Sequence, residues 1–347
     1  MYEFKVSNII RQPNNNISIQ FEDLSGAYPI YKSGQFLTLS FLFDNREVRR
    51  SYSFSSSPYA NEPIEITVKR VENGEISRLL HHKLKVNDVI NVLEPQGLFV
   101  YEPQVVKSTN TIFLFAAGVG ITPLFSILKT VLLTDNTTKV VLVYSNNSKE
   151  NTLFYDELLS WKAKYSERLF IEFIWSNSKN LMKARLNRDY LISIVKSNLL
   201  TDINEFYTCG PLFYMDLVRF TLLGMGILDE HIHKETFHFP EEEDDDDEHE
   251  EEEVDSKVYN VLLNYNGSAY SLKVHGYETI LEVGLKHNLK LPYSCKSGMC
   301  STCISQVKHG SVKMDYNEVL TDNEVLNGKC LLCVSHPVED NLVIDVD

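Results

Sequence analysis

The cysteines constrain the fold of this chain more than any other feature of its sequence. Five of the six lie within the last 53 of the 347 residues. Cys295, Cys300 and Cys303 follow a C-x4-C-x2-C pattern, and Cys330 and Cys333 come about 30 residues later. Such clustering favours a metal site over a disulfide framework. The spacing is typical of a [2Fe–2S] cluster, for which one loop supplies three thiolates and a distant segment the fourth. Zinc is the alternative, but zinc ligands are usually paired in two C-x2-C hairpins.

The net charge of −15 is concentrated in one short strip. Residues 241–253 hold 12 of the 48 acidic residues and Asp255 adds another, whereas residues 1–240 hold 25 acidic and 25 basic residues. We expect residues 240–255 to form a solvated linker that stays extended because its charges repel one another. Cation binding is the alternative role. An acidic chain is not expected to bind nucleic acid or an anionic membrane surface.

The rest of the chain divides into three parts by its pattern of apolar residues. Residues 1–103 hold short alternating segments separated by turn residues, which predicts an antiparallel Greek-key β-barrel with one helix after Gly74. Residues 104–239 alternate strands with helices, which predicts an α/β nucleotide-binding domain with a parallel sheet. Residues 256–347 hold a hairpin, a helix and the cysteine loop, which predicts a small third domain with both strands and a helix.

One apolar stretch, residues 112–133, approaches the length of a membrane span and has Lys129 as its only charged residue. Gly118, Gly120 and Pro123 lie in its middle, where they would break a helix. We therefore expect a buried strand, a glycine turn and a helix, with no membrane insertion. The N-terminal sequence has no apolar core beside a cleavage site, so a cytoplasmic location is expected.

Two motifs in the predicted barrel indicate a flavin. Arg50 can pair with a pyrophosphate, the ring of Tyr52 can lie on a flat cofactor ring, and Ser53 can hydrogen-bond a ring nitrogen. Further along, Gly74 and Ser77 open a helix, and the N-terminus of a helix binds phosphate through its free amides. Each motif is weak alone, but two in one barrel favour a bound flavin nucleotide.

Two further motifs indicate a second nucleotide. Each follows a predicted strand and opens a helix, which is the usual place for a pyrophosphate. Neither is specific alone, and Cys209 has the alternative of being an ordinary buried thiol. The two motifs comprise Gly118, Gly120, Thr122 and Pro123 in the first, and Cys209, Gly210 and Pro211 in the second.

The order of the two barrel motifs, R-x-Y-S and then G-x-x-S, resembles the flavin-binding barrel of the ferredoxin–NADP reductase superfamily. The resemblance implies that Arg50, Tyr52 and Ser53 contact the flavin, and that Gly74, Ile76 and Ser77 lie near its pyrophosphate. It implies FAD rather than FMN, because the G-x-x-S element accompanies the longer cofactor in related enzymes.

In the same superfamily, the two glycine turns of the second domain carry the nucleotide pyrophosphate and face the nicotinamide. The resemblance implies that Ser53 and Cys209 act in catalysis through geometry and polarisation. Relatives that use NADPH commonly have an Arg where this chain has Asn147, and Lys149 can replace it as a point charge, so NADPH is weakly favoured over NADH. Glu235 and Phe237 fall in a segment that resembles the one closing over the flavin.

Residues 256–347 resemble a plant-type ferredoxin, which implies an α+β domain of the β-grasp type. The segment from Gly328 to Cys333 matches the G-x-x-L-x-C signature of these ferredoxins, which implies that Cys333 rather than Cys330 is the fourth ligand, together with Cys295, Cys300 and Cys303. Gly298 suits such a loop, because the backbone must pass close to the cluster and offer it amide donors.

The order of reductase first and ferredoxin last resembles the reductase components of multicomponent oxygenases, most closely the phenylacetyl-CoA oxygenase (epoxidase) reductase type. The resemblance implies electron flow from NAD(P)H to FAD, to the [2Fe–2S] cluster and on to a partner diiron or Rieske oxygenase. One alternative is a reductase of another redox protein, such as a hybrid-cluster protein. The other is a non-autonomous electron-transfer subunit of a larger dehydrogenase, which the long step from Cys303 to Cys333 disfavours.

Overall fold

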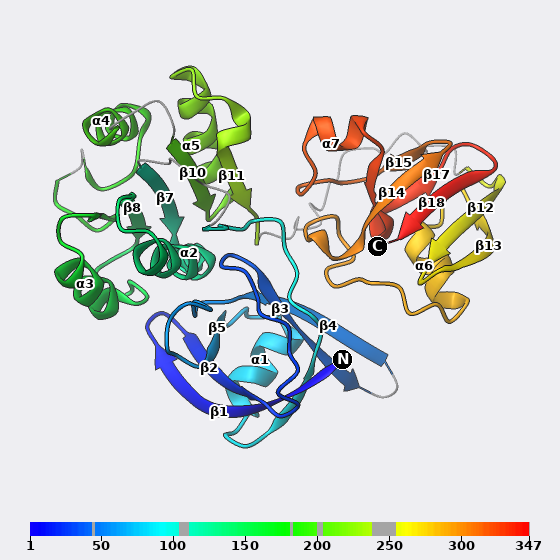
Figure 1. Ribbon diagram of the computed structural model, residues 1–347, viewed down its shortest axis with the longest axis horizontal. Coiled ribbons are helices and arrows are strands. Elements are labelled where there is room, and N and C mark those ends of the chain that lie inside the picture. The colour runs from blue at the N-terminus through cyan, green and yellow to red at the C-terminus, as the bar shows by residue number, and fades with distance from the viewer. Residues whose placement is uncertain (44–45, 104–110, 181–182, 200–203, 238–254, 347) are drawn as a thin grey trace. The chain divides into compact units, whose positions relative to one another are not determined.

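The computed structural model describes residues 1–43, 46–103, 111–180, 183–199, 204–237 and 255–346 (Figure 1). The chain forms two compact units, and the division falls between Phe237 and His238. The predicted acidic linker lies outside the described residues except for Asp255, whose carboxylate accepts hydrogen bonds from the Tyr259 hydroxyl at 2.7 Å and the Lys257 amide at 3.0 Å.

The first part of unit 1 is an antiparallel barrel of six strands in the order β4-β3-β6-β1-β2-β5. A bridge between Phe54, just after β4, and Ile66 in β5 closes the sheet on itself. Helix α1 follows β5, and its Ile76 and Leu80 pack into the barrel core. The elements are β1 (Tyr2–Gln12), β2 (Asn16–Asp23), β3 (Phe36–Phe43), β4 (Arg46–Ser53), β5 (Ile64–Lys69), α1 (Glu75–His82) and β6 (Val89–Val92).

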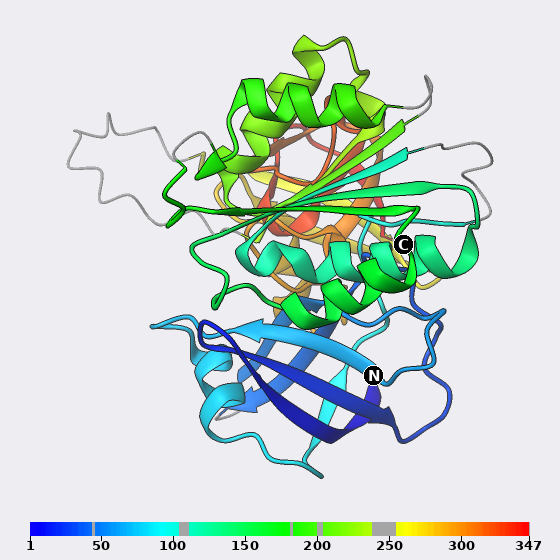
Figure 2. The ribbon, with the colours of Figure 1, turned by 90° about the vertical axis from the view of Figure 1, so that its left-hand side faces the viewer.

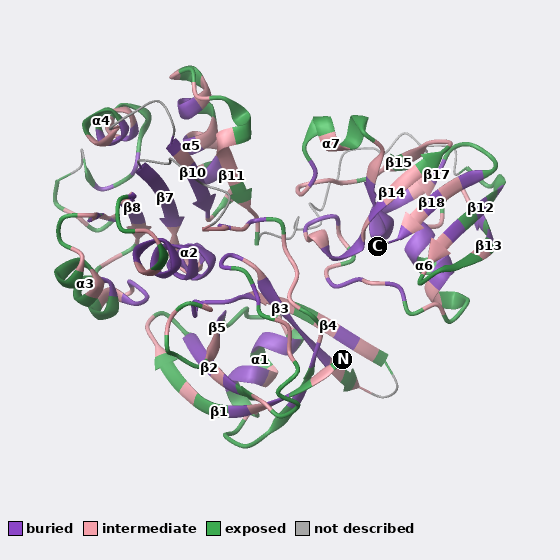
Figure 3. Cartoon of the chain, viewed as in Figure 1, coloured by how far each residue is buried: buried purple, intermediate pink, exposed green. Residues whose placement is uncertain are grey.

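The second part of unit 1 is a five-stranded parallel sheet in the order β11-β10-β7-β8-β9. Helices cover both faces, as Figure 2 shows, and each face has its own apolar core. The central strands are therefore buried on both sides (Figure 3), which explains their continuous apolar sequences. The elements are β7 (Thr111–Ala117), α2 (Ile121–Thr134), β8 (Lys139–Asn146), α3 (Tyr155–Lys164), β9 (Leu169–Trp175), α4 (Arg188–Asn198), β10 (Asn204–Cys209), α5 (Leu212–Gly224) and β11 (Ile232–Glu235).

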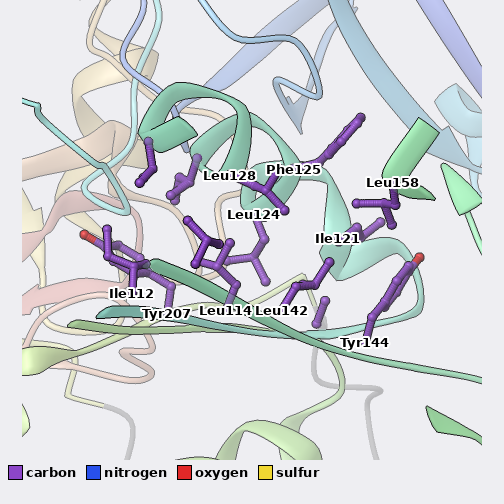
Figure 4. Close-up of a cluster of buried hydrophobic side chains, with 14 of the residues drawn as sticks. Ile112, Leu114, Ile121, Leu124, Phe125, Leu128, Leu142, Tyr144, Leu158 and Tyr207 are labelled. Carbon is purple, nitrogen blue, oxygen red and sulfur yellow. The ribbon is translucent and has the colours of Figure 1, made fainter. Parts of the chain in front are cut away.

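The apolar stretch 112–133 forms β7, a glycine turn and α2, as predicted. Leu124 and Leu128 of α2 pack on Leu114 and Leu142 of the sheet (Figure 4). None of the helices in the described part of the chain has both the length and the apolar character needed to cross a membrane.

Unit 2 is a five-stranded mixed sheet in the order β13-β12-β18-β14-β16, beside a two-stranded sheet of β15 and β17. The β12–β13 hairpin turns at Asn266 and Gly267, which both have positive φ, as a tight hairpin turn requires. The elements are β12 (Val258–Tyr265), β13 (Ser268–His275), α6 (Ile280–Lys286), β14 (Ile304–His309), β15 (Val312–Met314), α7 (Asp322–Leu326), β16 (Lys329–Leu331), β17 (Ser335–Pro337) and β18 (Leu342–Val346). The predicted combination of an antiparallel barrel, a parallel α/β sheet and a ferredoxin-like α+β domain is confirmed.

Candidate cofactor sites

Strand β4 carries the residues that the sequence predicts for the flavin. Side chains alternate along a strand, so Arg50 and Tyr52 share a face with Arg46, and Ser53 lies on the opposite face. Arg46 pairs with Glu75 at 3.0 Å, which brings the first turn of α1 beside β4. Burial raises the pKa of the Tyr52 phenol, and the charge of Arg50 opposes this shift. The two predicted flavin motifs are thus neighbours in the fold.

The start of α1 offers backbone donors. Gly74 precedes the helix and no side chain caps it, so the N–H groups of the first turn have no partner within the helix. The Ser77 hydroxyl accepts the Val71 N–H at 3.1 Å, so it is engaged by its own loop. Ile76 is buried in the barrel core. The amides, rather than the Ser77 hydroxyl, are therefore the groups available to a phosphate here.

At Ser53 the barrel contacts the parallel sheet. Its hydroxyl donates to Glu235 Oε2 at 3.1 Å. Glu235 ends β11 and lies opposite Cys209, the last residue of β10. Burial raises the pKa of Glu235 to about 8, and the Ser53 hydrogen bond opposes this. Burial and the neighbouring Glu235 also raise the pKa of the Cys209 thiol. A buried serine, a half-buried carboxyl and a buried thiol thus converge at one place.

The glycine turns after β7 and β10 pack backbone to backbone. A Cβ on Gly120 would lie 2.2 Å from the Cys209 carbonyl oxygen, so no larger residue fits there. Gly118 has a φ of +56° and open space where its Cβ would be. The two turns therefore lie side by side. The contact between Ser53 and Glu235 is nearby, because Cys209 touches the first turn through its carbonyl oxygen and lies opposite Glu235 in the sheet.

The other residues predicted for the nucleotide shape these turns. A Cβ on Gly210 would lie 2.9 Å from the Ala117 Cβ, and Pro211 immediately precedes α5. Thr122 donates to a carbonyl oxygen of the preceding turn at 3.0 Å. Thr122 and Pro123 are both buried in the first turn of α2.

Lys149 lines a cavity of about 460 Å³ at the carboxyl end of β8. Its Nζ lies 4.8 Å from the centre of the Tyr155 ring. Glu150, Asp156 and Glu157 line the same cavity, and none of the other predicted nucleotide residues does. Three carboxyl groups around one lysine make this cavity less favourable for a phosphate than the sequence suggests.

In unit 2, the thiols of Cys295, Cys300, Cys303 and Cys333 lie in contact with one another. Hydrogen bonds with Cys300 and then Cys333 lower the pKa of Cys295. Cys333 also hydrogen-bonds Cys303, whose pKa is lowered as a result. Cys330 has a different environment: it is fully buried in the core of the unit, and burial raises the pKa of its thiol to about 12. Cys333, not Cys330, faces the other thiols.

The backbone of the cysteine loop turns toward these sulfurs. The N–H groups of Ser297 and Met299 each donate to Cys295 Sγ at 3.4 Å. Gly298 has a φ of +71°, and a Cβ there would lie 2.3 Å from the Tyr316 carbonyl oxygen, so only glycine fits. This is the close backbone approach that the sequence predicts.

Several buried hydroxyls have no hydrogen-bond partner within the described part of the chain. Ser297 and Ser301 lie in the cysteine loop, between its three thiols. Buried donors need acceptors, so this loop suits a bound group. Thiolates, loop amides and free hydroxyls fit an iron–sulfur cluster. Thr208 and Thr236 also lack a partner, but they are the chain neighbours of Cys209 and Glu235, and consecutive side chains in extended backbone point to opposite faces.

Three family models match the chain. The oxidoreductase FAD-binding domain matches residues 23–101, the oxidoreductase NAD-binding domain residues 114–219, and the 2Fe-2S iron-sulfur cluster binding domain residues 263–338. Fold, sites and family models define an NAD(P)H-dependent oxidoreductase with FAD and a [2Fe–2S] cluster. The predicted FAD and cluster are confirmed.

Relatives of known function match along almost the whole chain. One of the subunits of the 1,2-phenylacetyl-CoA epoxidase of Escherichia coli K12 is 30% identical, over 100% of this chain and 98% of its own length. The ferredoxin reductase component of the 3-ketosteroid-9-alpha-monooxygenase of Rhodococcus rhodochrous is 32% identical, over 98% of this chain and 95% of its own length. The glycine betaine monooxygenase reductase subunit of Pseudomonas aeruginosa is 30% identical, over 91% of this chain and 87% of its own length. The chain belongs to this family of oxygenase reductase components.

Solved structures share the fold. Phthalate dioxygenase reductase matches 99% of this chain and 97% of its own, with a TM-score of 0.63 and 24% identity. An intact type IV self-sufficient cytochrome P450 monooxygenase matches 99% of this chain through 40% of its own, with a TM-score of 0.74 and 20% identity.

Proposed function

We propose that this chain delivers electrons from NAD(P)H to a partner oxygenase of the phenylacetyl-CoA epoxidase kind. The observation that carries the proposal is the match to the Escherichia coli epoxidase protein, which spans both chains almost completely. The ketosteroid and glycine betaine monooxygenase reductases also match, at similar identity. They make a Rieske-type or other redox protein the second candidate acceptor.

Within unit 1, we propose that the nicotinamide reaches the flavin at the place where Ser53, Cys209 and Glu235 converge. FAD, when bound, accepts two electrons as a hydride and releases them singly. The Ser53 hydroxyl donates its hydrogen to Glu235 Oε2 at 3.1 Å, so in this position its oxygen would accept a hydrogen bond from the cofactor ring. The fully buried Cys209 excludes water behind the nicotinamide. No strong acid or nucleophile is required, because the task is to hold two rings in contact.

The binding roles follow the same geometry. Arg50 and the amides after Gly74 hold the FAD pyrophosphate, and Tyr52 lies on the cofactor ring. The two glycine turns, with their neighbouring residues, hold the pyrophosphate of the nicotinamide nucleotide. The full set comprises Arg50, Tyr52, Ser53, Gly74, Ile76 and Ser77 for FAD, and Gly118, Gly120, Thr122, Pro123, Cys209, Gly210 and Pro211 for the nicotinamide nucleotide. Lys149, which the sequence predicts for NADPH, lines a separate cavity with three carboxyl groups and keeps only a small role in nucleotide choice.

In unit 2, we assign the four cluster ligands to Cys295, Cys300, Cys303 and Cys333. The convergence of these thiols supports the assignment. We place the protein in the cytoplasm and the domain limits at residues 1–103, 104–239 and 256–347. Residues 240–255 would be an extended linker, whose role is to let the ferredoxin domain visit the flavin and then the acceptor at high effective concentration.

The test is reconstitution with defined acceptors. Purified chain with NADPH is combined with the oxygenase subunits of a phenylacetyl-CoA epoxidase or with the oxygenase component of a glycine betaine monooxygenase. We expect substrate-dependent NADPH oxidation with the first only. Turnover with the second alone would assign the other acceptor class. Failure to reduce ferricyanide with either nucleotide would instead indicate a non-autonomous subunit.

A further inference from the structure

One face of α2 is polar although it is buried. Ser126, Lys129 and Thr130 are spaced so that they share one face of the helix, and none is more than 3% exposed. Leu124 and Leu128 belong to the apolar core that the helix forms with the sheet (Figure 4). Buried polar groups cost free energy unless they find partners. The hydrogen-bond and ion-pair partners of these three side chains come from the barrel part of unit 1.

These partners lie in the loop that follows β4, residues 54–62. The Ser126 hydroxyl donates to the Ser56 carbonyl oxygen at 2.5 Å. The Thr130 and Ser57 hydroxyls share a hydrogen bond of 2.7 Å. Hydrogen bonds are directional, so these contacts fix the position of the helix along the loop, which an apolar contact would not do as strictly.

An ion pair completes the contact. Lys129 Nζ lies 2.5 Å from Glu62 Oε1, and the two side chains are 4% and 32% exposed. The ammonium also lies 4.4 Å from the centre of the Phe125 ring. Glu62 Oε1 in turn accepts the Ser57 N–H at 2.7 Å. Because a buried charge needs its partner, Lys129 holds Glu62 and the loop in one arrangement.

The contact joins the two elements that carry the proposed cofactor residues. Strand β4 ends at Ser53, immediately before the loop, and α2 begins directly after the Gly118–Gly120 turn. Hydride transfer needs reacting atoms at near-contact distance, and a displacement of about 1 Å can cost roughly 100-fold in rate. We propose that Lys129 and Glu62 are positioning residues that set the distance between the nicotinamide and the flavin. This inference rests on the function proposed above.

The test uses the full-length chain loaded with FAD and three variants, Lys129→Met, Glu62→Gln and the double variant. We expect anaerobic flavin reduction at saturating NADPH to slow roughly 10- to 100-fold in each, with FAD content and nucleotide Kd little changed. The double variant should be no slower than Lys129→Met, because both changes remove one interaction. In the flavin-free chain, hydrogen exchange should become faster in residues 54–62 and in α2.

A matched control is Lys5→Met, which breaks the more exposed Lys5–Glu22 pair of 2.5 Å in the same unit and should leave the reduction rate unchanged. Should Lys129→Met not fold, Glu62→Gln alone carries the test. A reduction rate within about twofold of the parent chain would overturn the proposal, as would a loss explained entirely by missing FAD. Failure of the parent chain itself to be reduced by NADPH or NADH would contradict the proposed function instead.

Discussion

The two candidate sites are built in opposite ways. In unit 2, Cys295, Cys300 and Cys303 lie within one loop, and only Cys333 comes from a distant segment. In unit 1, Ser53 and Glu235 are 182 residues apart and meet only because a barrel strand packs against the end of a parallel sheet. A site held by one loop is defined by local spacing, whereas a site between two domains depends on how they pack. Substitutions should therefore act differently on the two.

The largest effect should come from the distant ligand of the local site. Cys333→Ser removes one of four converging thiols, so we expect complete loss of the cluster's visible absorption in the purified chain. Cys330→Ser is the matched control, because that thiol is buried in the core and should leave the spectrum intact. The opposite pattern would show that Cys330, and not Cys333, is the fourth ligand of the cluster.

The next effect concerns the packing of the two glycine turns. Gly120→Ala places a Cβ 2.2 Å from the Cys209 carbonyl oxygen, so the turns must separate. We expect the rate of flavin reduction by NADPH to fall about 100-fold, while cluster absorption stays unchanged. Gly224→Ala is the control, because the atom nearest its Cβ would be 3.8 Å away. Equal rates in the two variants would mean that the turns do not hold the nucleotide.

The third effect should appear in the stability of unit 1 instead of in a rate. Glu235 has a folded pKa of about 8, above its ordinary value of 4.5. Between these pH values the unfolded chain loses the proton that the folded chain keeps, so this group makes stability fall as pH rises from about 4.5 to 8. Glu235→Gln should remove that fall, which is worth about 5 kcal/mol at most.

The measurement is urea unfolding of the flavin-free chain followed by tryptophan fluorescence, since Trp161 and Trp175 both lie in unit 1. Relative to the parent chain, Glu235→Gln should gain stability from pH 5 to pH 8. Glu72→Gln, at an exposed position, should not. A parallel pH dependence in Glu235→Gln and the parent chain would contradict the raised pKa of the Glu235 carboxyl.

The smallest effect should be that of Lys149→Ala on the preference for NADPH over NADH. Lys149 is exposed and shares its cavity with three carboxyl groups. A surface charge of this kind contributes about 1 kcal/mol or less, so Lys149→Ala should lower kcat/KM for NADPH about fivefold or less and leave that for NADH unchanged. A strong preference of the parent chain for NADH would remove the role of Lys149.

The same contrast explains what the sequence could predict. The cluster loop, the barrel and the parallel sheet were predictable because spacing and periodicity are local. Glu235 was only a candidate for the segment that closes over the flavin, since a strand with alternating residues looks the same whether or not it reaches a cofactor. Its contact with Ser53 was not predicted. Lys129 was predicted only as part of a buried helix. Its pairing with Glu62 depends on the packing of two domains, which no local pattern encodes.

The central claim is that both sites serve one electron path, and anaerobic titration with NADPH tests it most directly. Flavin absorbance and the EPR signal of the reduced cluster are followed together in the full-length chain. We predict that both cofactors become reduced, and that in Cys333→Ser only the flavin does. A parent chain whose flavin is fully reduced while its cluster stays oxidised would contradict the account.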